Sequence, residues 1–423
     1  MQSQVALNVQ QSIRPGECID TFYAGKENSL KQCHATVEDN RFFQGLQSTQ
    51  SNSSSTVTFN PNEGLGEVII ALQLPAPATG LGLAAPLGWG YNLIRRIGYR
   101  YGSSQLYYVT GSQNLIQTIA LCEDSGKKQA ILFLGGQALT TTQDWADPAK
   151  RTAYVYLRLP HSSPALSGGA LPFPTDVLTA PVQLQIDLAD FSQVISAVAG
   201  ADVVPTQLAL GQVNFTQVTM QDAGDLIARR FDMSKHALTI PLPEGWTQEE
   251  VQFPFGSAAD GTFSLSLTGC KAGDLKKLRI WFTDPANTTG GIKNTNIWIP
   301  PASIRFAING LIYLDSLAGS YLLTNVLRRR TPPSVTASLI SSPAPPAFVA
   351  TNTASTFVEI DLAQPYAIGN SQEVALLHGV PVMNSVLNLT GTMPMGNNNY
   401  VCHVEYVLNC SWMASRGSAE FVF

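Results

Sequence analysis

The sequence contains few charged residues. Asp, Glu, Lys and Arg make up 13% of the 423 residues, whereas hydrophobic residues make up 44%. The 25 basic and 30 acidic residues give a formal net charge of −5, and neither half of the chain is basic. Binding to nucleic-acid phosphates needs a concentration of Lys and Arg, so direct nucleic-acid binding is disfavoured. Sparse charge is typical of surfaces buried in permanent subunit contacts, although a surface rich in Ser, Thr, Asn and Gln fits the composition equally well.

The sequence also lacks the features of secreted, membrane-spanning and metal-binding proteins. Residues Met1–Val9 carry no basic segment followed by an apolar core, and no apolar run reaches the ~18 residues of a membrane helix. The six cysteines are scattered without CxxC pairs, which argues against a zinc site and against a disulfide framework. We therefore expect a protein made in the cytosol, without a membrane span, a cofactor or a bound metal.

Complete catalytic motifs are lacking as well. Gly80–Ala85 matches part of a dinucleotide-binding fingerprint, but Pro86 follows directly and prevents the required helix. His403-Val-Glu405 beside Cys402 is similar to part of a zinc-deaminase motif, yet the downstream Pro-Cys-x-x-Cys is missing and the segment alternates like a strand. No serine lies in a G-x-S-x-G elbow. The sequence therefore predicts no catalytic residue, and a structural role for His403.

What the sequence does contain is short runs of alternating apolar and polar residues between turn residues. This pattern is typical of β-strands with one buried face. The strands predicted in this way are Thr56–Asn60, Glu67–Leu74, Gln129–Leu134, Ala153–Leu159, Val182–Leu188, Leu208–Met220, Ala237–Leu242, Thr262–Thr268, Lys277–Thr283, Ser303–Leu314, Thr356–Ala363, Ser385–Thr390 and Tyr400–Trp412. Helical patterning is limited to Asn114–Cys122 and a short piece at Ser192–Val198, which is too little for alternating βαβ units.

These strands divide into two similar halves. We predict an all-β fold of two tandem eight-stranded antiparallel jelly-roll sandwiches, with short helices in loops. The first sandwich is expected at residues 21–198 and the second at 207–423, joined by a linker at 199–206. Residues 1–20 are uncharged from Gln2 to Gln11 and rich in Gln, and we expect them to form an arm that becomes ordered on assembly.

Five segments, taken in order, resemble segments of a known family, the double jelly-roll major capsid proteins of nucleocytoplasmic large DNA viruses and of their virophage, polinton-like and adomavirus-like relatives. These segments are Tyr101–Gly111, Leu159–Asp187, Gly273–Phe282, Ile308–Tyr321 and the closing stretch Asn384–Phe421. Tyr101–Gly111 looks like the family's strand-turn-strand before a short helix. The closing stretch looks like the last hairpin of the fold. Together the segments cover most of residues 90–423.

The resemblance implies a structural protein rather than an enzyme. Three copies of the chain would form a pseudo-hexagonal capsomer of an icosahedral double-stranded DNA virus shell, and the protein would reside in the virion. The implied partners are the chain itself, neighbouring capsomers, and penton and minor capsid proteins. A carbohydrate- or receptor-binding β-sandwich stays open as an alternative, with Trp89, Trp145, Trp246 and Tyr107–Tyr108 as stacking platforms. A glycan- or ester-cleaving enzyme is a more remote one.

Two groups of residues are candidate contacts between subunits. The first is the apolar group Leu81, Leu83 and Leu87, which lies in the Pro- and Gly-rich loop Leu74–Gly90. The second is the basic cluster Arg328, Arg329 and Arg330, for which a solvated loop is the simpler interpretation. The loops Leu74–Gly90 and Pro300–Asp315 are expected between subunits. We also predict that Leu83→Asp impairs trimer formation more than it impairs folding of the monomer.

Overall fold

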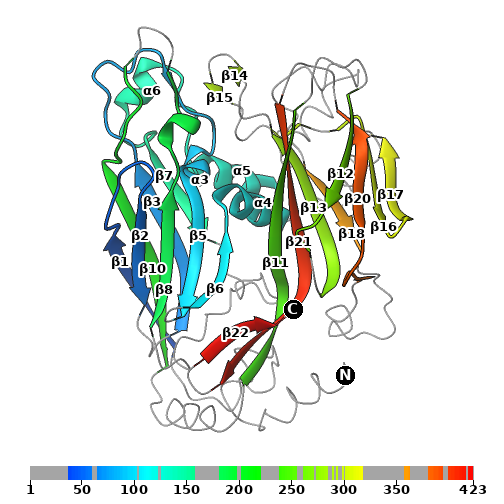
Figure 1. Cartoon of the computed structure of the whole chain (residues 1–423). Coiled ribbons are helices and arrows are strands. Elements are labelled where there is room, and N and C mark those ends of the chain that lie inside the picture. The colour runs from blue at the N-terminus through cyan, green and yellow to red at the C-terminus, as the bar shows by residue number, and fades with distance from the viewer. Residues whose placement is uncertain are drawn as a thin grey trace.

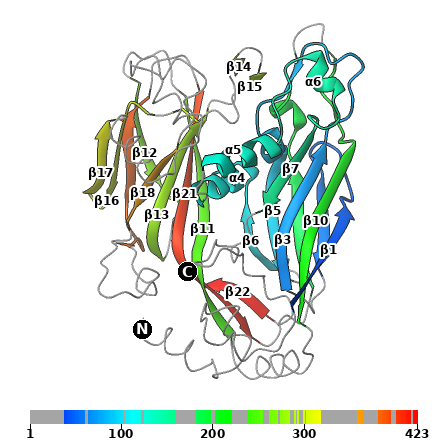
Figure 2. The ribbon, with the colours of Figure 1, turned by 180° about the vertical axis from the view of Figure 1, so that it is seen from behind.

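The chain forms two antiparallel β-sandwiches that stand side by side. The computed structural model describes residues 37–59, 64–101, 104–121, 125–157, 181–197, 202–220, 238–254, 261–270, 273–283, 288–289, 292–293, 298–299, 301–317, 357–362, 380–393, 399–415 and 418–422. The strands of both sandwiches run in roughly the same direction, as Figure 1 and the reverse view in Figure 2 show. The predicted arm at 1–20 lies outside the described residues. The all-β prediction is confirmed.

The first sandwich consists of two four-stranded sheets. One sheet has the order β1 (Val37–Gly45), β10 (Leu210–Met220), β3 (Gly64–Gln73), β7 (Thr152–Leu157), and the other has β2 (Ser54–Phe59), β8 (Val182–Leu188), β5 (Ile94–Tyr101), β6 (Ser104–Val109). Numbered along the chain, these eight strands are arranged 1-8-3-6 and 2-7-4-5, which is the order of a jelly roll. The short strands β4 (Leu83–Ala84) and β9 (Ser196–Ala197) pair with each other at one end.

The second sandwich repeats this order. One sheet has β11 (Leu238–Pro254), β21 (Asn399–Ser415), β13 (Asp274–Thr283), β18 (Val358–Asp361), and the other has β12 (Thr262–Leu267), β20 (Leu387–Thr392), β16 (Ser303–Ile308), β17 (Leu311–Leu317). Short strands β19 (Val380–Pro381) and β22 (Ser418–Val422) extend the first sheet, and β14 (Thr288–Thr289) pairs with β15 (Ile292–Lys293). The principal strands are again arranged 1-8-3-6 and 2-7-4-5. The prediction of two tandem jelly rolls is therefore confirmed.

The boundary between the sandwiches lies later in the chain than predicted. Strand β10 pairs with β1 and β3, both of which belong to the first sandwich. The first sandwich therefore extends to Met220, and the predicted linker at 199–206 precedes its last strand instead of following it. The reason is topological: the eighth strand of a jelly roll returns to pair with the first, and a local sequence pattern does not record so distant a partner.

Among the described residues, the helices lie in the connections of the first sandwich: α3 (Trp89–Leu93), α4 (Gly111–Leu121), α5 (Ser125–Leu134), α6 (Thr142–Ala146) and the 3-10 turn η3 (Phe191–Gln193). The helix predicted at Asn114–Cys122 is confirmed as α4. The strand predicted at Gln129–Leu134 is wrong, because these residues end α5, and Ser192–Val198 is not helical beyond its first turn. No helix among the described segments is both long enough and apolar enough to cross a bilayer.

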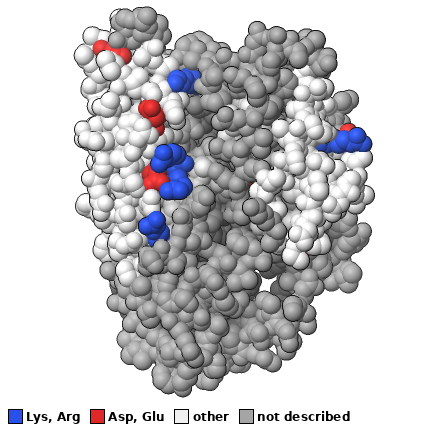
Figure 3. Space-filling view, in the orientation of Figure 1, with Lys and Arg blue, Asp and Glu red and all other residues white. Residues whose placement is uncertain are grey.

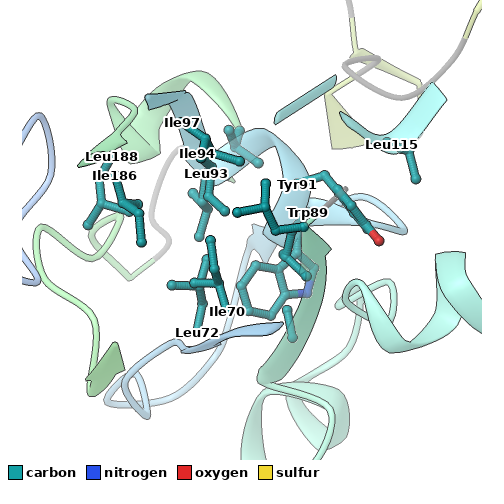
Figure 4. Close-up of a cluster of buried hydrophobic side chains, with 14 of the residues drawn as sticks. Ile70, Leu72, Trp89, Tyr91, Leu93, Ile94, Ile97, Leu115, Ile186 and Leu188 are labelled. Carbon is teal, nitrogen blue, oxygen red and sulfur yellow. The ribbon is translucent and has the colours of Figure 1, made fainter. Parts of the chain in front are cut away.

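Each sandwich has an apolar core built from the predicted alternation. Val182, Leu184, Ile186 and Leu188 of β8 are at most 1% exposed and belong to the core of the first sandwich. Figure 4 shows Ile186 and Leu188 near Ile70 and Leu72 of the opposite sheet. In β12 the side chains of Phe263–Leu267 alternate between buried apolar residues and exposed serines. Each fully buried aliphatic side chain stabilises the fold by about 1.5–3 kcal/mol. The second sandwich has its own cluster of buried residues on β12, β13, β16, β18, β20 and β21.

The segment predicted as one strand at Ser303–Leu314 is a hairpin. Asn309 and Gly310 adopt positive φ angles of 49° and 82° and form the turn between β16 and β17. Two consecutive residues with positive φ are the requirement of the tight turn that suits the twist of a hairpin, and Asn-Gly meets it best. Asn309 also ties this turn to the neighbouring segment, because its side chain accepts a hydrogen bond from the backbone N–H of Val386 at 2.8 Å.

Candidate assembly surfaces

The face of β13 and β21 that points away from the core of the second sandwich carries charged residues. Along β13, Leu278, Ile280 and Phe282 belong to that core, so Arg279 and Trp281 lie on the opposite face. Arg279 is only 1% exposed although it lies outside the apolar core of its own sandwich. A buried arginine on the outer face of a sheet indicates that something else covers the face.

Arg279 lies between two buried glutamates of the same sheet. Its Nε is 3.2 Å from Oε2 of Glu359 on β18, and its Nη1 is 3.2 Å from Oε2 of Glu405 on β21. The side chains of all three residues are at most 1% exposed. The Nζ of Lys277, which is partly exposed, lies 3.9 Å from the other oxygen of Glu359. The guanidinium thus joins three adjacent strands through charge-assisted hydrogen bonds.

Helix α4 of the first sandwich completes this cluster. Gln113 and Gln117 both donate a side-chain N–H to Oε1 of Glu405, Gln113 at 3.1 Å. Residues four apart on a helix lie on the same face, which is why two glutamines of one helix reach a single carboxylate oxygen. We call Gln113, Gln117, Arg279, Glu359 and Glu405 the interface cluster, because it links the two sandwiches.

Helix α4 is fixed in position by contacts with the first sandwich. Gly111 at its start lies so close to α3 that an added Cβ would be 1.8 Å from the carbonyl oxygen of Tyr91. The Asn114 side-chain N–H donates to the carbonyl oxygen of Tyr156 at 2.7 Å. Leu115, Ile116 and Ile119 are buried in the core of the first sandwich. The helix therefore presents its two glutamines from a rigid support.

Apolar contacts flank the interface cluster. Trp281, Trp298 and Phe357 come from the second half of the chain but pack in the apolar cluster of the first sandwich. The ring of His403 stacks on Trp281 with centroids 5.2 Å apart, and its Nε2 lies 2.8 Å from the hydroxyl of Thr283. His403 therefore packs against a tryptophan of the interface. Lys293 of β15 adds a contact by donating to the carbonyl oxygen of Ser192.

The two outer edges of the molecule carry exposed apolar side chains. At the edge of the first sandwich, Phe43 of β1 is 76% exposed. At the edge of the second sandwich, Leu311 of β17 is 64% exposed. Strands β1 and β17 lie at opposite ends of the molecule in Figure 1 and Figure 2. Exposed apolar side chains at strand edges are typical of surfaces that pair with another chain.

The apolar candidates near residue 81 differ in exposure. Leu81 is 60% and Leu87 42% exposed, so both stay candidate subunit contacts. Leu83 is 2% exposed and packs in the core of the first sandwich, so its assignment as a subunit contact was wrong. Leu83 lies in the short strand β4, and its side chain points into the core. The composition of the loop could not show this direction. Arg328, Arg329 and Arg330 lie outside the described residues.

A carboxylate holds the loop that carries Leu81. Asp202 Oδ2 accepts hydrogen bonds from the backbone N–H of Thr79 at 2.8 Å and of Gly80 at 2.6 Å. The pKa of Asp202 is lowered, mainly by the hydrogen bond that its carboxylate accepts from the backbone N–H of Thr79. Next to this carboxylate, Val203 is 85% exposed, and the backbone N–H of Asp202 donates to the Leu81 carbonyl oxygen. The loop thus presents two aliphatic side chains to solvent in a fixed arrangement.

Leu81 and Leu83 provide a matched pair of substitutions. We expect Leu83→Asp to prevent folding, because it places a carboxylate in the apolar core. Leu81→Asp should leave the melting temperature of the monomer unchanged, because its side chain is in solvent, while lowering the fraction of trimer. Thermal unfolding and light scattering measure the two effects. A Leu83→Asp protein that melts at the wild-type temperature would contradict the placement of Leu83 in the core. A Leu81→Asp protein that forms trimers as wild type does would show that Leu81 is not a subunit contact.

Two of the three tryptophans proposed as sugar-stacking platforms are internal. Trp89 is fully buried and donates to the carbonyl oxygen of Gln137 at 3.1 Å. Trp145 is 1% exposed and donates to the carbonyl oxygen of Leu83 at 3.0 Å. Neither ring can stack on a sugar. The side chains of Trp246 and Tyr107–Tyr108 lie outside the described residues.

Comparison with solved structures identifies the architecture. The protein in the quasi-atomic model of the PBCV-1 virus capsid matches with a TM-score of 0.63 at 10% identity, covering 92% of this chain and 98% of that one. The faustovirus major capsid protein matches with a TM-score of 0.59 at 7% identity, covering 90% and 91%. The mavirus major capsid protein matches with a TM-score of 0.51 at 7% identity, covering 90% of both chains. This chain has the double jelly-roll fold of viral major capsid proteins. The sequence itself matches no family model and no curated protein.

Sequence reasoning missed the interface cluster of this double jelly-roll chain. Arg279 stands between Leu278 and Ile280, and Glu405 stands between Val404 and Tyr406. The sequence does contain one sign of this cluster, which is a single charged residue within an otherwise apolar strand. When both faces of its sheet are covered, such a residue needs a partner of opposite charge. The partners on α4 are distant in sequence, so the signal indicates a buried ion pair without identifying its members.

Proposed function

We propose that this protein is the major capsid protein of an icosahedral double-stranded DNA virus and that it functions as a homotrimeric, pseudo-hexagonal capsomer. The observation that carries the proposal is the repetition of one jelly-roll strand order in both halves of a single chain, matched over 92% of its length by the protein of the PBCV-1 capsid model. Two similar units in one chain allow three chains to surround a threefold axis with six sandwiches. The resulting outline is close to hexagonal, which suits flat packing.

The arrangement of the sandwiches supports such a tile. They stand side by side with their strands in a common direction (Figure 1), so three copies can form a ring with all strands perpendicular to the shell. The outer edges marked by Phe43 and Leu311 lie at opposite ends of the chain. Contact between one edge and the opposite edge of the next copy is heterologous, and such contacts form a ring when the rotation between successive copies closes, here at 120°. Uncharged surface predominates over the described part of the face in Figure 3.

The role is structural and not catalytic, and the protein resides in the virion. The buried charges of the interface cluster are held by one another and by glutamines of the same chain, an arrangement that holds the two halves together. Other copies of the capsomer are its principal partners, with penton and minor capsid proteins as further ones. The burial of Trp89 and Trp145 removes two of the platforms on which the carbohydrate-binding alternative rested.

Light scattering during size-exclusion chromatography of the purified chain tests the proposal. One chain has a mass of 45.4 kDa, so three copies give about 136 kDa. We expect a stable species of this mass at micromolar chain concentration. A folded monomer that stays monomeric at high concentration would contradict the proposal and would favour a binding module.

A further inference from the structure

We propose that the interface cluster is an orientation lock, which fixes the angle between the two sandwiches and so selects the geometry of the trimer. This inference rests on the proposed function. The lock connects α4 of the first sandwich, through Gln113 and Gln117, to three strands of the second, through Glu405, Arg279 and Glu359. Its role is to specify one arrangement among several that apolar contacts alone would permit.

Stability alone does not account for a buried ionic cluster at this place. Removing the charges of Arg279, Glu359 and Glu405 from water carries a large desolvation cost, and apolar residues of similar volume often stabilise a buried site as well or better. Each sandwich already has an apolar core of its own. The contacts of Trp281, Trp298 and Phe357 with the first sandwich supply the apolar part of the interface. What the ions add is directionality.

The geometry of the cluster demands one relative position of the sandwiches. The guanidinium of Arg279 is a planar fork, and its two hydrogen bonds fix Glu405 relative to Glu359 within the second sandwich. Both glutamines of α4 then converge on Oε1 of Glu405. Hydrogen bonds weaken steeply when their length or angle departs from the optimum, so α4 can slide or rotate very little. Trp281, by contrast, packs through non-directional contacts that tolerate such movements.

A fixed angle matters because the trimer repeats it. In a closed ring of three chains, the outer edges marked by Phe43 and Leu311 have to meet those of the neighbouring copies. Any error in the angle within one chain displaces both edges from their partners. A ring is therefore more sensitive to the angle than the folding of either sandwich is.

The test removes the hydrogen bonds from α4 to Glu405 and leaves the Trp281 and Lys293 contacts across the interface in place. In Gln113→Met/Gln117→Met the helix keeps residues of similar size and good helix propensity, and Arg279 continues to pair both glutamates. Gln113→Met also removes the hydrogen bond that Gln113 accepts from the backbone N–H of Thr110, which Gln117→Met alone preserves. The control is Gln73→Met, which changes a half-buried glutamine on β3 that donates to Thr152 within the first sandwich. Thermal unfolding, trimer dissociation measured by light scattering, and small-angle X-ray scattering at one fixed chain concentration are compared with the wild-type protein.

We expect the α4 variant to fold but to melt below wild type, because the buried Oε1 of Glu405 loses both of its donors. It should also need about tenfold more chain for half-maximal trimer and give a broader distance distribution. The control should match wild type in all three measurements. Equal trimer dissociation and equal scattering profiles for the α4 variant and wild type would overturn the lock. If the double variant does not fold, Gln117→Met alone is judged by the same criteria.

The two proposals fail in different ways. A wild-type chain that never trimerises would reject the capsid function, yet the scattering profile of the monomer would still report whether Gln113 and Gln117 fix the angle. A wild-type trimer together with an unaffected α4 variant would reject the lock and leave the capsid function in place.

Discussion

Gly111→Ala is expected to yield little or no folded protein. A Cβ at this position would lie 1.8 Å from the carbonyl oxygen of Tyr91 and 2.5 Å from that of Ile94. Both atoms belong to the backbone of α3 and of the start of β5, so no side chain can rotate away to relieve the clash. The helix α4 would have to move, which separates Gln113 from Glu405. The loss of unfolding free energy should exceed the ~1–3 kcal/mol typical of overpacking.

Gly45→Ala is the control for that substitution. An added Cβ at Gly45, at the end of β1, meets nothing within 4 Å. Soluble yield and melting temperature should therefore match wild type or improve slightly, because alanine reduces the freedom of the unfolded chain. Both variants are compared by circular dichroism during heating. A Gly111→Ala protein that melts like Gly45→Ala would show that α3 and α4 are not in contact as described.

Trp89→Ala should destabilise the first sandwich by about 3–5 kcal/mol. The indole is fully buried, and Figure 4 shows it among the apolar side chains of this core. It also fills the space that Gly136 leaves free, since a Cβ there would lie 2.6 Å from the indole nitrogen. Removing the ring leaves a cavity and an unpaired carbonyl oxygen at Gln137. Urea denaturation gives the change in unfolding free energy.

Tyr154→Ala provides the comparison for an exposed ring. Tyr154 of β7 is 47% exposed on the face of the sheet away from the core, so its loss should change stability by less than about 1 kcal/mol. If Trp89→Ala and Tyr154→Ala had equal effects, the assignment of Trp89 to the core would be wrong. Sugar binding that depended on Trp89 would contradict the structural role in a second way.

Local alternation predicted the strands because their buried faces depend only on nearby residues. The run from Val182 to Leu188 is predicted with the bounds that β8 has, and Thr262–Leu267 forms β12 as the serine alternation indicates. Alternation did not identify Gln129–Leu134, whose continuous apolar run fits a strand or a helix equally well. The run ends α5, where Ile131 and Leu132 pack partly on the core and Phe133 is half exposed.

Long-range pairing could not be predicted in this way. Strand β10 alternates as expected, but its partners β1 and β3 lie far back in the chain, and the predicted boundary was therefore too early. The interface cluster has the same origin, since Gln113 and Glu405 are 292 residues apart. Local patterns do not show which distant strands pair. The order of the five segments that resemble the capsid-protein family did predict the overall topology, because that family has a known strand order.

Electron microscopy of the assembled particle tests the central claim most directly. Class averages of the purified assembly, viewed along its symmetry axis, should show a hexagonal outline with six lobes of similar size, two from each of three chains. Isolated two-lobed particles at every concentration, or rings with another number of chains, would contradict the proposal that this protein is a major capsid protein.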